Sequence, residues 1–250
     1  RSANALEIII GQGAKPGTGG LLLGFKVSDT IANQRDLPPG VDQRSPVRHP
    51  DWMGADDLMI KMEELREVTE GKVPIFIKLG AGRVTDDVKI AAKVGADVIV
   101  VDGMEAGTGA SPELQLDHIG IPTMPATAEA VRALHELGLE DEVDLVVSGG
   151  FTSGADMAKA LAMGAKCVAI GTAALIALNC NKSIYLEDYA KLGTRPGACH
   201  HCHTGLCPVG ITTQDPDLES RLDPEEAADR VFNYLNALTL EIQLLARACG

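Results

Sequence analysis

The stretch Val94–Val100, VGADVIV, joins the end of a predicted helix through Gly-Ala to a run of β-branched residues. Met163–Ile170, MGAKCVAI, repeats the same order further along the chain. Glycine commonly ends helices and β-branched residues favour strands, so both stretches predict a helix followed by a buried strand. Strands that alternate with helices in this way indicate a parallel sheet with crossover helices.

This pattern extends over most of the chain. The predicted strands are Leu6–Ile10, Pro74–Leu79, Ala96–Asp102, Val143–Ser148 and Cys167–Gly171, with a possible sixth at Ile121–Pro125. The predicted helices between them are Ala55–Thr69, Thr85–Val94, Ala126–Leu137 and Gly154–Met163. We expect an α/β fold of the (β/α)8 TIM-barrel type, of which this chain forms the C-terminal part, with the first strands on another segment. A smaller open α/β sheet is the alternative.

Composition and charge narrow the class of protein. The 250 residues are 45% hydrophobic, enough for the core of one α/β domain. The formal net charge of −13 argues against nucleic acid or an anionic membrane as a partner. No apolar run approaches the ~20 residues that span a bilayer, so we expect a cytoplasmic protein. Its six cysteines are then thiols or metal ligands rather than disulfides.

Glycines follow two consecutive predicted strands. Ser148, Gly149 and Gly150 end one strand, and Gly171 and Thr172 end the next. Barrels commonly bind phosphate with backbone N–H groups after their last two strands. These residues therefore predict a site for the phosphate of FMN, although glycine also ends strands for purely steric reasons.

A lysine and a loop of small residues extend this predicted site. Lys78 ends the strand IFIKL, where a cation would stabilise an anionic reduced flavin. The loop Asp102–Pro112, DGMEAGTGASP, has little side-chain bulk, so its backbone can approach a flat ring or a phosphate. Within the loop we assign cofactor contacts to Asp102, Gly107, Thr108 and Gly109. A solvated lysine and a tight turn are the structural alternatives.

A second glycine-rich loop carries a candidate substrate site. Gly11–Gly24 reads GQGAKPGTGGLLLG, and Lys15 is its only charge. Arg35 follows, and its planar guanidinium matches the two oxygens of a carboxylate. Lys15 and Arg35 together predict a site for a dicarboxylate, although each alone is more often a surface charge.

A cysteine-rich run indicates bound metal. Ala198–Asp215 reads ACHHCHTGLCPVGITTQD and places Cys199, Cys202 and Cys207 within nine residues. Proline follows the third cysteine, as in ferredoxin-type runs, so we predict an iron–sulfur cluster. A zinc ion held by these cysteines and the neighbouring histidines is an alternative.

Several motifs together resemble a known family. GQGAKPGTGG, IFIKL, DGMEAGTGASP, VSGGFTSGADMAKALAMGA, IGTAALIAL and CHTGLCPVGITTQDP occur in the order found in the FMN-binding synthase domain of glutamate synthase. The resemblance implies a barrel that binds FMN, three cysteines that hold a [3Fe–4S] cluster, and reductive amination of 2-oxoglutarate to glutamate. It assigns the substrate carboxylates to Lys15 and Arg35, the flavin to Lys78, its phosphate to Ser148–Gly150 and Gly171–Thr172, and the cluster to Cys202 and Cys207.

The sequence departs from the family pattern in three places. Leu21-Leu22-Leu23-Gly24 replaces a glutamine-containing segment of the substrate loop. The first cluster cysteine is either Cys180 or Cys199, and with both of them four thiols would suit a [4Fe–4S] cluster. The glutamine-hydrolysing domain is absent from this sequence. An amidotransferase or another amine-supplying subunit is therefore expected as a partner, unless the enzyme uses a free amine.

The resemblance extends to two freestanding relatives, archaeal-type glutamate synthase and the FMN subunit of N-methylglutamate synthase, which exchanges methylamine with glutamate. The cluster is expected to receive electrons from a donor subunit or ferredoxin within a hetero-oligomer. A non-catalytic electron-transfer subunit is the alternative. Lys15, Lys78 and Glu105 are the catalytic candidates. We divide the chain into a barrel portion (1–179), a cluster loop (180–215) and a C-terminal helical segment (216–250).

Overall fold

Five strands form one parallel sheet in the computed structural model, which describes residues 3–15, 19–108 and 111–250. In spatial order they are β1 (Leu6–Ile9), β4 (Ile75–Gly80), β5 (Val98–Asp102), β6 (Asp144–Ser148) and β7 (Cys167–Ala169). Each new strand is added beside the strand before it, and all four pairings are parallel. The five predicted strands and the parallel α/β fold are confirmed.

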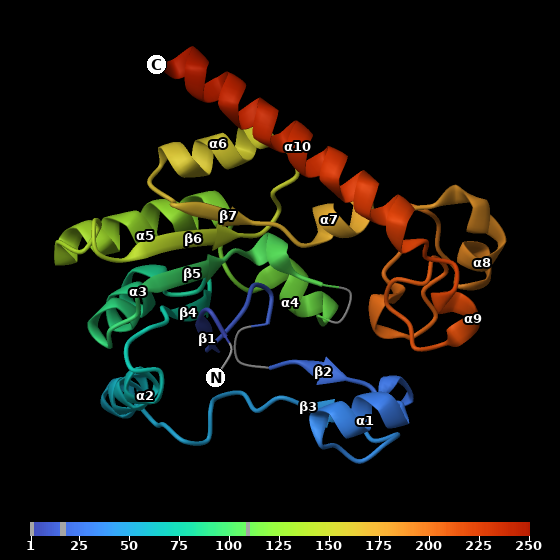
Figure 1. Ribbon diagram of the computed structural model, residues 1–250, viewed down its shortest axis with the longest axis horizontal. Helices are drawn as coiled ribbons and strands as arrows, with labels where there is room; N and C mark the ends of the chain where they lie inside the picture. Colours follow the sequence, from blue (N-terminus) through green and yellow to red (C-terminus); the bar gives the residue numbers. More distant parts are fainter. Residues whose placement is uncertain (1–2, 16–18, 109–110) are drawn as a thin grey trace.

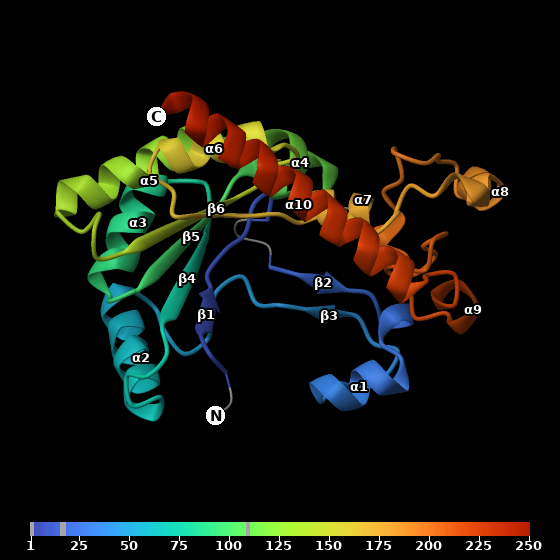
Figure 2. The same ribbon diagram turned by 45° about the horizontal axis from the view of Figure 1, so that its top comes forward.

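The crossover helices lie along one face of this sheet (Figures 1 and 2). They are α2 (Ala55–Val68), α3 (Val84–Lys93), α5 (Thr123–Leu137) and α6 (Gly154–Ala162), which confirms the four predicted helices. Helix α6 begins after Ser153, whose hydroxyl accepts the backbone N–H of Asp156, and α5 ends at Gly138 in the left-handed conformation. A sheet with its helices on one face leaves the other face for inward-pointing side chains.

Strand register decides which side chains enter the core. Ile8, Ile77, Ile99 and Leu145 are paired across four strands and are all buried against the helices. Burying each such side chain contributes ~1.5–3 kcal/mol to folding. The next position in the register carries Lys78, which therefore points to the opposite face of the sheet.

The sixth predicted strand, Ile121–Pro125, is wrong. Pro122 is the N-cap of α5, which begins at Thr123. Pro125 lies in the first helical turn, where its missing N–H removes no helical hydrogen bond. Ile121 still makes backbone hydrogen bonds, donating to Ala81 and accepting from Met104, but these do not extend into a ladder.

The remaining elements lie around the sheet. They are β2 (Leu21–Leu22), β3 (Gln43–Arg44), α1 (Asp29–Arg35), α4 (Glu113–His118), α7 (Thr172–Ala177), α8 (Leu186–Lys191), α9 (Pro216–Glu219) and α10 (Pro224–Cys249), with short 3-10 turns at Gly24–Lys26, Met104–Ala106, Ser183–Tyr185 and His201–His203. The strands β2 and β3 form a separate antiparallel ribbon, which lies beside α1 in Figure 2.

The C-terminal helix α10 packs on α6 and α7, as Figure 1 shows. A Cβ on Gly154 would lie 2.6 Å from the Leu238 carbonyl oxygen, so glycine is needed where α6 meets α10. The Gly154 backbone N–H also donates to Glu241 at 2.6 Å. Among the described residues, no helix has both the length and the apolar character required to cross a membrane.

Candidate functional site

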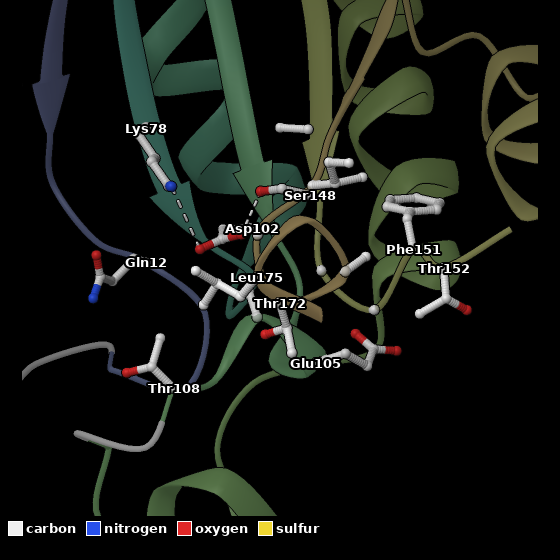
Figure 3. Close-up of a pocket in the computed structure, with 17 residues that line it drawn as sticks. Gln12, Lys78, Asp102, Glu105, Thr108, Ser148, Phe151, Thr152, Thr172 and Leu175 are labelled. Carbon is white, nitrogen blue, oxygen red and sulfur yellow. Dashed lines mark hydrogen bonds and ion pairs between the residues drawn. The ribbon is translucent and has the colours of Figure 1, made fainter. Parts of the chain in front are cut away.

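The carboxyl ends of β4, β5, β6 and β7 surround a cavity of about 320 Å³ (Figure 3). This volume lies within the range of small-molecule pockets, roughly 300–1,000 Å³. Most of the predicted flavin residues meet in its lining, namely Lys78, Asp102, Thr108, Ser148, Gly149, Gly150, Gly171 and Thr172, together with the catalytic candidate Glu105. Parallel strands end at one edge of a sheet, which explains how segments so far apart in sequence form one site.

Asp102 is the centre of the polar network in this cavity. Its side chain accepts the backbone N–H of Gly13 at 2.8 Å and the hydroxyl of Ser148, and Lys78 Nζ lies 3.6 Å from Oδ2. Figure 3 shows Lys78 and Ser148 on either side of this carboxylate. Asp102 is only 4% exposed, so its two oxygens are engaged by the protein itself. Its structural part is to join the Gly11–Gly24 loop to β5 and β6.

Two glycines let the backbone after β6 line the cavity. Gly149 and Gly150 have φ of 118° and 73°, a region that side chains disfavour. A Cβ on Gly149 would lie 2.5 Å from Thr123 Oγ1, and one on Gly150 would lie 2.9 Å from Glu105 Cβ. At Gly171 a Cβ would meet nothing within 4 Å. This bare backbone, with Lys78 at one side of the cavity, suits an anionic planar ligand.

Glu105 is held by Thr123, a residue that sequence reasoning missed. The Glu105 carboxylate accepts the backbone N–H of Thr123 at 2.9 Å and its hydroxyl at 2.8 Å. Thr123 Oγ1 also lies 3.2 Å from the Ser148 carbonyl oxygen and 3.0 Å from that of Gly149. Thr123 therefore fixes both Glu105 and the glycine turn, a role that no local sequence signal reveals.

Other lining residues were also missed. Gln12, Phe151, Thr152 and Leu175 face the cavity, and Phe151 and Leu175 add apolar surface to it. They lie within or beside the motifs quoted above, and this closeness in sequence was the only indication that they could belong to the site. Only the fold decides which of these neighbours point inward.

Three of the predicted substrate and cofactor residues that the structure describes do not line this cavity. Lys15 is half-buried, and burial lowers the pKa of its ammonium group. Arg35 is exposed in the last turn of α1. Gly107 packs against Leu116, and Gly109 lies outside the described residues. The structure therefore does not bring Lys15 and Arg35 together in the lining, and their assignment to a dicarboxylate stays a prediction.

A second candidate site lies beyond α7, where four cysteine thiols gather. We call it the cysteine site; it comprises Cys180, Cys199, Cys202 and Cys207. Cys180 and Cys199 pack on the buried group that contains Tyr189 and Cys207. Burial raises the pKa of the Cys180 thiol, and the charges of the other three thiols raise it further. Burial and the charges of Cys180, Cys199 and Cys207 raise the pKa of Tyr189 to about 12.

Backbone donors surround the third cysteine of the run. Burial acts to raise the pKa of Cys207, but the backbone N–H groups of Thr212, Val209 and Ile211 and the Thr212 hydroxyl bring it below its ordinary value. The turn after Cys207 is closed by a hydrogen bond from Gly210 N–H to the Cys207 carbonyl at 3.2 Å. Chain folding therefore prepares Cys207 to be a thiolate, the form that binds metals.

Buried polar atoms without a partner mark the same site. Among the described residues, the side-chain atoms of this kind are His201 Nδ1, His203 Nδ1 and Thr212 Oγ1. Burial and the charges of Cys207 and Cys199 raise the pKa of Cys202, and the nearby Thr212 hydroxyl opposes this rise. The same hydroxyl helps to lower the pKa of Cys207. Buried polar groups rarely stay unsatisfied, so this concentration fits a site that takes up an additional group.

The described side chains are not arranged to hold a single metal ion. Within the described part of the chain, no group of three or more His, Cys, Asp or Glu side chains is arranged to hold a metal ion. Structural zinc requires four ligands that converge on one centre. In an iron–sulfur cluster the thiolates bind different irons and surround the cluster instead.

Comparison with known proteins gives consistent matches along the whole chain. Residues 1–250 match the family described as the conserved region in glutamate synthase. The chain is 55% identical over its full length to a glutamate synthase large subunit-like protein of Rhizobium meliloti, of which it covers 57%. It is 43% identical over 99% of its length to the archaeal glutamate synthase [NADPH] of Methanocaldococcus jannaschii, of which it covers 46%.

The chain thus spans about half the length of the curated relatives that it matches. Among solved structures, the recombinant flavin-binding domain of baker's yeast flavocytochrome b2 is similar at 25% identity and a TM-score of 0.45. That similarity covers 70% of this chain and 37% of the other.

Proposed function

This chain belongs to the glutamate synthase family, and from that membership we propose that it is the FMN-binding part of an enzyme that aminates 2-oxoglutarate reductively. The observation that carries the proposal is the cavity in which Lys78, Asp102 and Ser148 meet the bare backbone of Gly149 and Gly150. Sheet order supports the finer fold assignment: five consecutive parallel strands with helices on one face are the arrangement of a (β/α)8 barrel.

The cavity residues fit a phosphorylated flavin. The glycine turn after β6 and the Gly171–Thr172 turn offer backbone N–H groups without side-chain bulk, which a phosphate requires. Phe151 and Leu175 offer apolar surface to a ring. When bound, FMN would supply a hydride to an imine carbon. We propose that Asp102, Gly107, Thr108 and Gly109, which belong to one loop, help to hold the bound FMN.

The chain's own residues would then have separate tasks. Lys78 would place a positive charge beside the ring, and Asp102 would hold the Lys78 ammonium at its 3.6 Å separation. Lys15 lies in the same loop as Gln12, to whose carbonyl the Lys15 backbone N–H donates, and would bind a substrate carboxylate with Arg35. Orienting both reactants in this way lowers the barrier by reducing the entropy lost on reaction.

Thr123 would keep the Glu105 carboxylate at the cavity wall, through the two hydrogen bonds that it donates. Glu105 is therefore our candidate for moving a proton at the substrate nitrogen. Geometry supports this role because Glu105 lines the same cavity as Lys78.

The cysteine site would bind an iron–sulfur cluster that passes electrons to the flavin. Cys180 lies three residues after the end of α7, and its backbone N–H donates to the carbonyl of Leu175, which lines the cavity, at 3.1 Å. An electron-donor subunit or ferredoxin would reduce the cluster, and an amidotransferase or another subunit would supply the amine. We retain 1–179, 180–215 and 216–250 as the proposed barrel, cluster and helical portions of this hetero-oligomeric enzyme.

The test is anaerobic reoxidation of the reduced flavin in the full-length protein that contains this chain. We expect the visible flavin absorbance to return when 2-oxoglutarate is added with ammonium or with methylamine, and not with either reactant alone. The amine that works decides between glutamate and N-methylglutamate as product. A protein that binds no flavin, or whose flavin is never reoxidised by these reactants, would contradict the proposal.

Substitution at Lys78 sharpens this test. Lys78→Met should slow the reoxidation and make the flavin harder to reduce, because the positive charge beside the ring is lost. Lys72→Met is the matched control, since Lys72 is exposed and pairs with Glu70 on the surface. Equal rates and potentials for both variants would remove Lys78 from the mechanism.

A further inference from the structure

The cysteine site brings in one thiol from outside the cysteine-rich run. Cys180 lies nineteen positions before Cys199 and three residues after the end of α7. The hydroxyl of Tyr189 donates to the Cys180 carbonyl at 2.6 Å, and Tyr189 is only 1% exposed. Tyr189 also packs on Cys207. A buried side chain with a single hydrogen-bonding group thus fixes the backbone of Cys180 against the run that carries the other thiols.

The surroundings of the cysteine site compensate negative charge. Lys26 Nζ donates to the Cys202 carbonyl at 3.0 Å, and Arg221 Nη1 donates to the Pro208 carbonyl at 2.8 Å. Arg221 also pairs with Asp188 at 2.8 Å, and is held there by α8. Two cations from distant segments therefore meet a loop that contains no Lys or Arg between Cys199 and Asp215. In a chain with a formal charge of −13, such placement favours an anionic group at this point.

The unpartnered buried atoms give an independent indication. His203 Nδ1 and Thr212 Oγ1 lie in the segment between Cys202 and the end of the turn that follows Cys207. Neither atom has a hydrogen-bond partner among the residues that the structure describes. Inorganic sulfides and thiolate sulfurs accept hydrogen bonds, and such bonds tune cluster potentials. A cluster enclosed by the four thiols would offer hydrogen-bond partners to these atoms, and burying polar atoms without partners is unfavourable.

We propose that the cysteine site binds one [4Fe–4S] cluster, with each of its four thiols as a ligand. This deepens the proposed function, on which it rests, and differs from the three-cysteine set that the family resemblance implies. Each thiol loses its proton and forms one bond to one iron, so no electron enters or leaves the chain when the cluster binds. Cys180 is the ligand that retains the fourth iron.

The experiment compares cysteine variants of the full-length protein, purified and kept without oxygen. Iron and acid-labile sulfide are measured per flavin, and electron paramagnetic resonance spectra are recorded before and after reduction. We expect four irons and four sulfides, no signal from the oxidised cluster and a signal after reduction. Cys180→Ser should lose one iron and acquire the signal of an oxidised three-iron cluster.

Matched controls are available in the same chain. Cys167 and Cys249 are exposed and lie outside the cysteine site, so Cys167→Ser and Cys249→Ser should keep four irons. Three irons in the unaltered protein, or an unchanged cluster in Cys180→Ser, would overturn this inference and leave the proposed function standing. A protein that binds flavin but no iron would instead refute the iron–sulfur part of the proposed function. These readouts do not depend on enzyme activity.

Discussion

Replacing Asp102, which lies at the centre of the polar network in the cavity, should destabilise the protein. Asp102 is 4% exposed and accepts hydrogen bonds from Gly13 N–H, at 2.8 Å, and from the Ser148 hydroxyl. Asp102→Ala would leave both donors buried without an acceptor, and each such group costs ~1–3 kcal/mol. The ion pair with Lys78 adds little, because Lys78 is partly exposed and 3.6 Å away. We therefore expect the free energy of unfolding to fall by about 2–6 kcal/mol, the sum for the two donors.

Asp102→Asn separates hydrogen bonding from charge. The amide oxygen can still accept one of the two hydrogen bonds, while its NH2 group faces a donor, so we expect a loss of about 1–3 kcal/mol. The assay is urea unfolding followed by far-ultraviolet circular dichroism, with the cofactor-free protein, where a constant slope shows that stability alone has changed.

Asp144→Asn is the control, since Asp144 is exposed and its ion pair with Lys166 spans 4.0 Å. It should change stability by less than ~0.5 kcal/mol. If Asp102→Ala also stays within ~1 kcal/mol of the unaltered protein, then Asp102 does not hold the Gly11–Gly24 loop, and the argument from unsatisfied donors fails.

Three further predictions concern the two sites. Gly150→Ala should abolish flavin binding in a fluorescence titration, because the new Cβ would lie 2.9 Å from the Cβ of Glu105. Gly138→Ala is the control: Gly138 has a similar φ, but its Cβ would meet nothing within 4 Å, so the change should cost only ~1–2 kcal/mol of stability and leave flavin affinity unchanged. Thr212→Val should lower the reduction potential of the cluster by ~59 mV, which is a tenfold change in the equilibrium constant of a one-electron reduction, and Thr212→Ser should keep the original potential. Equal potentials for the two variants and the unaltered protein would show that the hydroxyl does not act on the cluster. In the cluster-free protein, folding lowers the pKa of Cys207, so its thiolate should stabilise the fold above the unfolded-state pKa of ~8.5. This contribution should be lost as the pH falls through the folded-state pKa. Urea unfolding across this pH range should show a pH-dependent stability that Cys207→Ser removes.

The sequence was sufficient for the main elements and for most of the cavity lining. Val94–Val100 predicted a helix, a turn and a buried strand, and the structure has α3 and β5 there. Parallel strands must end at a common edge, so residues that follow them, such as Ser148 and Gly171, were predictable neighbours. Ile121–Pro125 was mispredicted because its apolar residues resemble a strand, whereas the prolines start a helix.

Tertiary structure alone decided how the predicted groups are used. Asp102 was expected to face a cofactor, but the fold brings Gly13 and Ser148 to its two oxygens, a pairing between residues 89 and 46 positions away. Thr123 gained its role because β5 and β6 end beside the start of α5. Local sequence cannot encode such contacts, because they depend on strand register and on how the loops pack over the strand ends.

The cysteines show the same division. Their spacing determined that a metal group is expected, because three thiols in nine residues cannot lie far apart. Only the fold decided that Cys180 joins them, since α7 directs it and buried Tyr189 holds it. Residue type and spacing thus specify the chemistry available to this chain, and long-range packing specifies which residues share a site, because burial and register are properties of the whole folded chain.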